Sequence, residues 1–286
     1  MEDRSVLKYY DCHVHTRNSH DSVQEAPEIV SGMLAAGIHG LSVTDHLDTR
    51  PGEDHGFADN IGGSFAFWRD ELKPLAAAEG LEVFFGVELG DGIRNPEFAL
   101  NFPGKYPFDL LLGSVHKIYL DGEDLELCDV PYAALPQETR RRIVLKYYED
   151  LLLTASTLEF NVLSHLTLID RYNGYPETSD LFDTEFRDLV NAVLDTVIKR
   201  GIALEINSKG IENGRLMPDK YIIEEYFKKG GRLVTTGSDA HWGIHIGRGF
   251  RETTELLREI GFEAVFFFKN RVPFENPIEV WYNKCV

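Results

Sequence analysis

The chain has 286 residues, of which 43% are hydrophobic, and this is enough to bury the core of one α/β domain. Its 47 acidic and 29 basic residues leave a formal net charge of -18, which argues against general binding to nucleic acid or to anionic membranes, because phosphate groups are bound by basic surfaces. We find no apolar segment long enough to span a bilayer and no signal-peptide core, and the three scattered cysteines suit a reducing compartment, so we expect a cytoplasmic protein.

Strand-like and helix-like segments alternate along the chain. In chain order we expect strand 6–12, helix 24–36, strand 38–43, helix 65–79, strand 81–87, strand 108–115, helix 136–156, strand 160–164, helix 180–200, strand 201–204, helix 218–229, strand 230–236, helix 251–260 and strand 264–268. Most of the strand segments are apolar without alternation, which is typical of strands buried on both faces of a parallel sheet. Seven units of this kind, joined by right-handed crossovers, most naturally close into a barrel.

A glycine, a proline and two long segments that interrupt the alternation of strands and helices refine this prediction. Gly37 closes the first helix, and Pro74 indicates either a kink or a shorter second helix. The segments 47–64 and 117–135 are expected to be loops that cover the site, since long loops after barrel strands usually do so. We expect residues 1–286 to form a single domain.

Histidine or acidic residues follow the strand segments again and again. They are His13, His15, His46, Glu88, His116, His165, Glu205, Asp239 and His241. Active sites of parallel barrels lie at the carboxyl ends of the strands, so this recurrence predicts a polynuclear metal site at that end. His13 and His15 lie two residues apart on an extended segment, so both imidazoles face the same side and one cation can bind both. Such a pair alone is equally compatible with a structural role, and it is the other strand-end residues that favour metal binding.

The order of these motifs resembles that of the PHP (polymerase and histidinol phosphatase) family. The matching segments are HVHTRNSHDS, VTDH, GVEL, GSVH, LSH and GSDAH, within residues 11–247. The ending FFFKNRVPFENPI is also similar to that of the histidinol-phosphate phosphatase branch. The resemblance implies an α/β fold, a distorted (β/α)7 barrel, with a trinuclear metal site at the C-terminal ends of the strands.

The resemblance also implies which side chains hold three divalent metal ions. The first metal would be bound by His13, His15, Glu88 and Asp239. Glu88 would bridge to a second metal, which is held also by His116 and His165. The third would be bound by Asp21, His46 and His241. Some family members have histidine at the position of Asp21, so this chain resembles the subset with a carboxylate there.

The donor types indicate both the metals and the chemistry. Mixed nitrogen and oxygen donors suit Zn, Fe or Mn better than Ca or Mg, although affinity alone does not choose among them. A carboxylate that bridges two cations holds them close together, and a hydroxide formed from water between them can attack a phosphate ester. The residues therefore predict a phosphomonoesterase.

The resemblance narrows this to hydrolysis of L-histidinol phosphate to L-histidinol and phosphate in histidine biosynthesis. One alternative is a PHP phosphoesterase that acts on nucleotides or nucleic-acid ends, against which the negative charge argues. Another is a catalytically silent PHP interaction domain, which should have lost ligands. We therefore expect a small-molecule phosphomonoester as the partner, and neither nucleic acid nor membrane; the oligomeric state is not predicted.

Further residues are expected to act on the substrate. We assign catalytic roles to Asp239, His241 and Arg171, and substrate binding to Arg171, Lys209, Arg215 and His245. In the histidinol-phosphatase branch an arginine at a place similar to that of Arg171 contacts phosphate, and the alternative for this residue is a surface salt bridge.

The remaining polar residues near the motifs are assigned less specific roles. Asp11 and Asp45 flank ligands and could orient imidazoles, or they could be simple strand-end carboxylates. His20 and His55 lie in loops at the active-site end, whereas His39 is expected at the opposite end of the barrel.

Overall fold

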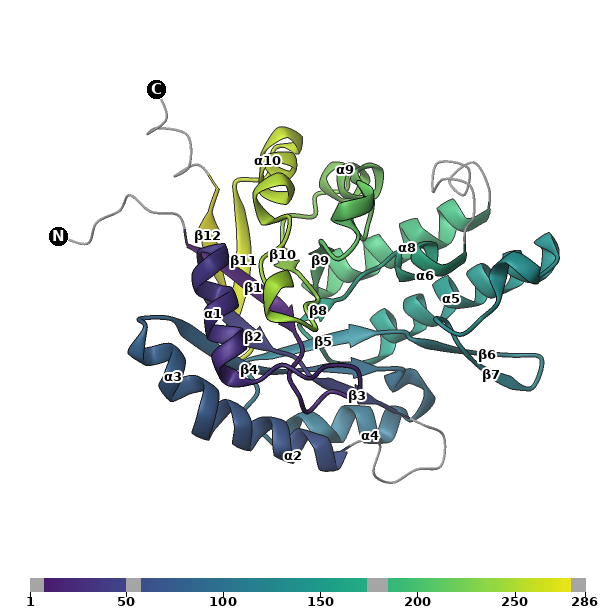
Figure 1. Ribbon diagram of the computed structural model, residues 1–286. Helices are drawn as coiled ribbons and strands as arrows, with labels where there is room; N and C mark the ends of the chain where they lie inside the picture. The colour runs from purple at the N-terminus through teal and green to yellow at the C-terminus, as the bar shows by residue number, and fades with distance from the viewer. Residues whose placement is uncertain (1–7, 50–57, 174–184, 279–286) are drawn as a thin grey trace.

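Seven parallel strands curl into a nearly closed barrel in a computed structural model, which describes residues 8–49, 58–173 and 185–278 (Figure 1). In the order in which they pair, they are β1 (Tyr9–Val14), β2 (Ile38–Val43), β4 (Glu82–Gly90), β5 (Leu110–Ser114), β8 (Val162–Leu163), β9 (Ala203–Asn207) and β10 (Val234–Gly237). At the carboxyl end of β1, Val14 forms a parallel bridge with Ala240, which lies beyond β10, and His15 N donates to Ala240 O at 3.0 Å. The predicted (β/α)7 barrel is therefore confirmed.

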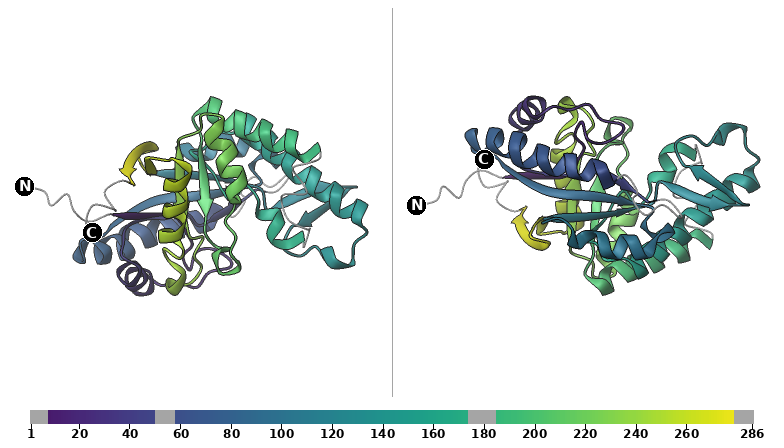
Figure 2. Two further views of the ribbon diagram at one scale, coloured as in Figure 1. Left: turned by 90° about the horizontal axis from the view of Figure 1, so that it is seen from above. Right: turned by 90° about the horizontal axis from the view of Figure 1, so that it is seen from below.

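Helices surround the strands, as the three views show (Figures 1 and 2). They are α1 (Ala26–Ala36), α2 (Ala58–Phe67), α3 (Lys73–Ala78), α4 (Pro96–Asn101), α5 (Gln137–Thr157), α6 (Leu168–Asn173), α8 (Glu185–Arg200), α9 (Lys220–Lys228) and α10 (Phe250–Ile260). The predicted first helix is confirmed, and Gly37 ends it in the left-handed conformation (φ 68°), as expected of a C-terminal glycine. The start of the predicted helix 180–200 lies outside the described residues.

The second predicted helix is longer than the sequence suggests. Helical structure begins at Ala58, passes through a π-helical turn at Trp68–Leu72 and continues into α3, whose second residue is Pro74. Proline has no N–H to donate, and a widened turn just before Pro74 keeps the helix continuous where a kink or a shorter helix was expected. The predicted start at residue 65 is thus wrong.

Both segments expected to be loops contain regular structure. The short strand β3 (His46–Asp48) begins the first one and pairs with the end of β4, and α2 occupies its last part. The second contains a hairpin of β6 (Lys117–Leu120) and β7 (Glu123–Glu126). His55 lies outside the described residues.

A second hairpin closes the other end of the barrel. It consists of β11 (Ala264–Lys269), which is the predicted terminal strand, and β12 (Val272–Pro277), which pairs with it antiparallel. Phe268 of β11 is buried against barrel residues that include Cys12 and Leu112. Apolar packing therefore fills the amino-terminal end, and the carboxyl end is left for polar residues.

Candidate metal centre

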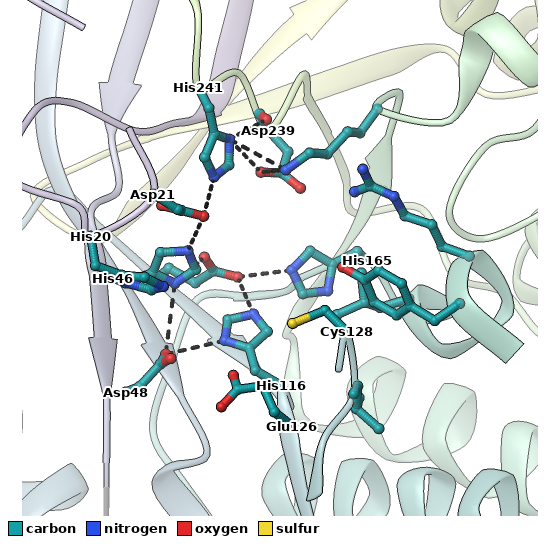
Figure 3. A pocket seen from close by; sticks show the side chains of 16 residues that line it. His20, Asp21, His46, Asp48, His116, Glu126, Cys128, His165, Asp239 and His241 are labelled. Carbon is teal, nitrogen blue, oxygen red and sulfur yellow. Dashed lines mark hydrogen bonds and ion pairs between the residues drawn. The ribbon is translucent and has the colours of Figure 1, made fainter. Parts of the chain in front are cut away.

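The structure brings all nine predicted ligands together at the carboxyl ends of the strands. Figure 3 shows those that line the pocket, among them Asp21, His46 and Asp239. Each lies at or just beyond the end of a strand, except Asp21, which comes from the segment between β1 and α1. The donor atoms form overlapping groups within 4.8 Å of one another, and most of these side chains are buried.

The first group is centred on His13 and His15. Their Nε2 atoms lie 3.1 Å apart. Glu88 Oε2 lies 3.3 Å from His13 Nε2 and 3.6 Å from His15 Nε2. Asp239 Oδ1 lies 3.4 Å from His15 Nε2 and 4.0 Å from His13 Nε2. Two ring nitrogens and two carboxylate oxygens that converge in this way are the donor set of a divalent cation.

Glu88 joins this group to the next one. Its Oε1 lies 3.2 Å from His116 Nε2 and 2.8 Å from His165 Nε2. Its Oε2 is buried and has no hydrogen-bond partner among the described residues. A buried carboxylate that turns one oxygen to each group suits a ligand that bridges two cations.

The third group lies at the rim of the site. Asp21 Oδ2 is 2.6 Å from His241 Nε2 and 3.5 Å from His46 Nε2. The His15 ring lies between these two histidines, with centroids 4.4 Å from His46 and 4.3 Å from His241. The group therefore adjoins the first one.

The electrostatics of the buried groups also favour bound cations. Burial favours the neutral form of Glu88, but the imidazoles of His13, His116 and His46 hold the pKa of this carboxyl well below its usual value. Burial and the neighbouring His241 and His46 lower the pKa of His15 well below its usual value. Burial favours the neutral form of His13 and His116 as well, but neighbouring carboxylates raise the pKa of both rings well above the usual value, so a cation must displace their protons. The ionised carboxylate of Glu88, the unprotonated His15 and the mixed nitrogen and oxygen donors fit Zn, Fe or Mn.

Other side chains hold the imidazoles in place. Glu205 Oε1 lies 2.7 Å from His13 Nδ1, and its Oε2 accepts from the backbone N–H of His165 at 2.7 Å. Asp48 Oδ1 lies 3.1 Å from His116 Nδ1. Sequence reasoning assigned no role to Asp48 and noted Glu205 only as a strand-end residue.

Neither Asp11 nor Asp45 contacts an imidazole directly among the described residues, but Asp45 reaches His15 through the Ser19 hydroxyl, which lies 3.0 Å from His15 Nδ1. Asp11 accepts from the backbone N–H groups of Ser238 and Gly247, both at 2.9 Å. Asp45 accepts from Thr16 and from the hydroxyls of Ser19 and Ser64. These carboxylates fix the backbone segments that carry ligands.

The donor groups face a pocket, which two of the four expected substrate-binding residues line. Arg171 is exposed at its edge, and Lys209 Nζ lies 2.9 Å from Asp239 Oδ1 and 3.3 Å from His241 Nδ1. Arg215 instead lines a neighbouring cavity, which Arg171 also borders. His245 lies in the turn Gly243–His245 and is not among the described residues that line either cavity.

The other histidines occupy different positions. His20 lines the pocket, with its ring 5.0 Å from that of His46. His39 pairs with Glu82 at 3.4 Å, and Glu82 is the first residue of β4, so His39 lies at the opposite end of the barrel as expected.

Among the described helices, none combines the length and the apolar character needed to cross a membrane.

Comparisons with known proteins bear on this site. The family model described as "PHP domain" matches residues 11–209. A protein of Thermotoga maritima named "Probable histidinol-phosphatase" is 31% identical over 255 residues, which are 88% of this chain and 93% of that protein. The histidinol-phosphatase of Lactococcus lactis is 27% identical over 270 residues, with 92% and 95% of the two chains covered.

A solved structure extends the likeness to the fold. The crystal structure of histidinol phosphate phosphatase from Lactococcus lactis, complexed with Zn, L-histidinol and phosphate, superposes with a TM-score of 0.71 and 22% sequence identity. It covers 94% of this chain and 100% of that one. The two chains share the same fold along almost their whole length.

Proposed function

We propose, since the chain belongs to the PHP family, that it is a metal-dependent phosphomonoesterase that hydrolyses L-histidinol phosphate to L-histidinol and phosphate. The convergence of nine side chains that could bind metals, Glu88 and eight others, carries this proposal. Relatives named histidinol-phosphatases align with about nine-tenths of the chain, and the similar solved structure holds both products of this reaction and Zn.

Three divalent cations would be held by the donor groups described above. His13, His15 and Asp239 would hold one, His116 and His165 another, with Glu88 shared between them. Asp21, His46 and His241 would hold the third. Divalent cations in such a site activate water as a nucleophile and neutralise the charge of the phosphate group.

The protein's own residues keep these donors oriented and bind the phosphate. Because Glu205 accepts at His13 Nδ1, the Nε2 atom of this ring faces the other donors. Lys209 and Arg171 add cationic groups at the pocket, and the planar fork of arginine matches two phosphate oxygens. Because Asp239 contacts Lys209, its carboxylate would hold the Lys209 ammonium group beside the phosphate.

The rest of the pocket suits the leaving group. Leu127, Cys128, Leu168 and Tyr172 give it one largely apolar wall. A flat imidazole ring such as that of histidinol can pack against an aromatic ring and aliphatic side chains, whereas the phosphate stays at the polar side.

The partners and the location follow from the same chemistry. A net charge of -18 disfavours polyanionic substrates, so we propose a small-molecule ester and no nucleic acid. The free thiols of Cys12 and Cys128 suit a reducing cytoplasm.

A substrate panel tests the proposal. Protein loaded with Zn, Mn or Fe should release phosphate from L-histidinol phosphate far faster than from nucleoside monophosphates or short oligonucleotides, with chelated protein as the control. L-histidinol should accumulate in equal amount to phosphate. Preference for a nucleotide or an oligonucleotide end would overturn the substrate, and no hydrolysis of any ester by metal-loaded protein would overturn the enzyme.

A further inference from the structure

A buried carboxylate that is not among the predicted ligands lies beside the metal centre. Asp48, the last residue of β3, is 3% exposed. Its Oδ1 lies 3.1 Å from His116 Nδ1 and 3.7 Å from His46 Nδ1 (Figure 3). Asp48 thus lies beside one imidazole from each of two donor groups. On His116 it faces the nitrogen that is turned away from Glu88, whereas His46 Nδ1 also lies 3.1 Å from Glu88 Oε2.

We propose that Asp48 is a positioning residue that fixes the ring of His116 and so maintains the donor group of Glu88, His116 and His165. A ring that donates its Nδ1–H to a carboxylate has its free electron pair on Nε2, the atom a metal needs. Here Nε2 of His116 points to Glu88 Oε1 at 3.2 Å. This inference rests on the proposed metal centre, and it holds whatever ester the enzyme hydrolyses.

The strand register and a glycine make room for this contact. β3 pairs with β4 in parallel, so that Asp48 lies beside Gly90. A Cβ atom at Gly90 would lie 2.0 Å from Asp48 Oδ1 and 2.8 Å from His116 Nδ1. Only glycine at this position lets the carboxylate and the ring meet, which is an observation independent of their distance.

A second buried carboxylate holds the backbone of the same histidine. Asp91 Oδ1 accepts from the N–H of His116 at 2.8 Å and from that of Lys117 at 2.9 Å. Asp91 has a φ of 55°, in the left-handed region that non-glycine residues rarely adopt. With its backbone held by Asp91, His116 needs only the Asp48 contact to fix its ring.

The two imidazoles should depend on Asp48 to different degrees. The 3.1 Å contact with His116 is a hydrogen bond, whereas the 3.7 Å separation from His46 is too long for one. Loss of Asp48 should therefore weaken the group that contains His116 more than the group of Asp21 and His241.

Metal binding tests this inference directly. Purified full-length Asp48→Ala, Asp48→Asn and wild-type protein would be stripped of metal and titrated with Zn²⁺ against a chelating indicator. We expect Asp48→Ala to weaken the affinity of at least one Zn²⁺ by about 10- to 100-fold, as is typical when a carboxylate that supports a histidine ligand is removed. Asp48→Asn should show a smaller loss, because its side-chain oxygen can still accept from His116.

Two further variants separate positioning from general damage. Gly90→Ala should reproduce the loss of affinity with Asp48 unchanged, because the added methyl occupies the space of the contact. Asp195→Ala is the matched control, since Asp195 is exposed on α8 and pairs only with Lys229 among the contacts of the described residues. Circular dichroism melts would identify any variant that fails to fold.

The outcomes distinguish this inference from the proposed function. Equal Zn²⁺ affinity in wild-type protein and Asp48→Ala would overturn the positioning role alone, as would anomalous scattering from Zn-loaded crystals that places Asp48 in direct bonding contact with a metal. Wild-type protein that binds no divalent cation would overturn both. Zinc density lost selectively beside His116 in Asp48→Ala crystals would support the inference.

Discussion

Replacement of Glu88 with glutamine should remove nearly all activity, because this one carboxylate contacts imidazoles from every donor group. Its oxygens lie 2.8 to 3.6 Å from imidazole nitrogens of five histidines, which are His13, His15, His46, His116 and His165. Glutamine has nearly the same shape, but it carries no charge and presents an NH₂ group in place of one oxygen. That group can only donate, so it faces at least one donor set with the wrong polarity.

The size of the effect follows from the position of Glu88. Loss of a residue that merely supports a metal ligand costs about 10- to 100-fold, and loss of one group that stabilises the transition state costs about 100- to 1,000-fold. Glu88 would be a ligand of two cations, so we expect kcat to fall by more than about 1,000-fold, or about 4 kcal/mol in activation free energy.

Phosphate release from L-histidinol phosphate would be measured at saturating Zn²⁺ or Mn²⁺, together with the bound metal per chain. Glu82→Gln is the matched control, because Glu82 lies on the same strand at the opposite end and accepts from the Tyr10 hydroxyl at 3.2 Å. Its activity should stay within about twofold of wild type, as expected for a residue remote from the chemistry. Glu88→Gln protein with a tenth or more of the wild-type kcat would show that the carboxylate does not bridge catalytic metals.

Three more outcomes are expected. Lys209→Met and Arg171→Gln should each lower kcat/KM for L-histidinol phosphate by about 10- to 100-fold, because each removes one hydrogen bond to a charged group. Unchanged kinetics would show that the substituted residue does not bind the phosphate. Chelation should abolish turnover, and Zn²⁺ or Mn²⁺ but not Ca²⁺ should restore it; recovery with Ca²⁺ alone would contradict the imidazole-rich donor set. Burial raises the pKa of the Tyr148 phenol well above its usual value. Above about pH 10 the phenol is therefore ionised in the unfolded chain but not in the folded protein. The free energy of unfolding of the metal-free protein should then fall by ~1.4 kcal/mol per pH unit because of this group. Urea titrations should show that the free energy of unfolding falls less steeply with pH in Tyr148→Phe than in wild-type protein. Tyr119→Phe, which changes an exposed tyrosine, should keep the wild-type slope. Equal slopes in wild-type protein and Tyr148→Phe would contradict the argument.

Most of the proposed ligands could be predicted from the sequence because they follow apolar runs, whereas Asp21 lies between β1 and α1 and is assigned by the resemblance. Parallel strands bring their carboxyl ends to one edge, so residues as distant as His13 and Asp239 are predicted to meet without any knowledge of the strand order. Even His165 follows an apolar run, although β8, the strand before it, has only two residues in the structure.

The supporting residues could not be found in this way, because their roles depend on pairing between strands. Asp48 meets His116 only through the register of β3 on β4, and the spacing of residues along the chain does not show that register. The substrate roles of Arg215 and His245 stay predictions, and their places in the structure also differ from what the sequence suggests. Each lies near a motif in the sequence, yet Arg215 faces a neighbouring cavity and His245 lines neither.

The two ends of the barrel therefore contribute differently to the free energy of unfolding. At the amino-terminal end Phe268 completes an apolar core, which stabilises the fold without any ligand. At the carboxyl end the Nε2 atoms of His13 and His15 lie 3.1 Å apart, and Glu88 Oε2 is buried without a hydrogen-bond partner among the described residues. Such a cluster costs stability unless cations neutralise it, and a cation at 100 times its Kd returns about 2.7 kcal/mol. Since Glu88 Oε2 is left without a hydrogen bond among so many polar neighbours, the arrangement is better explained by metal binding than by stability of the fold.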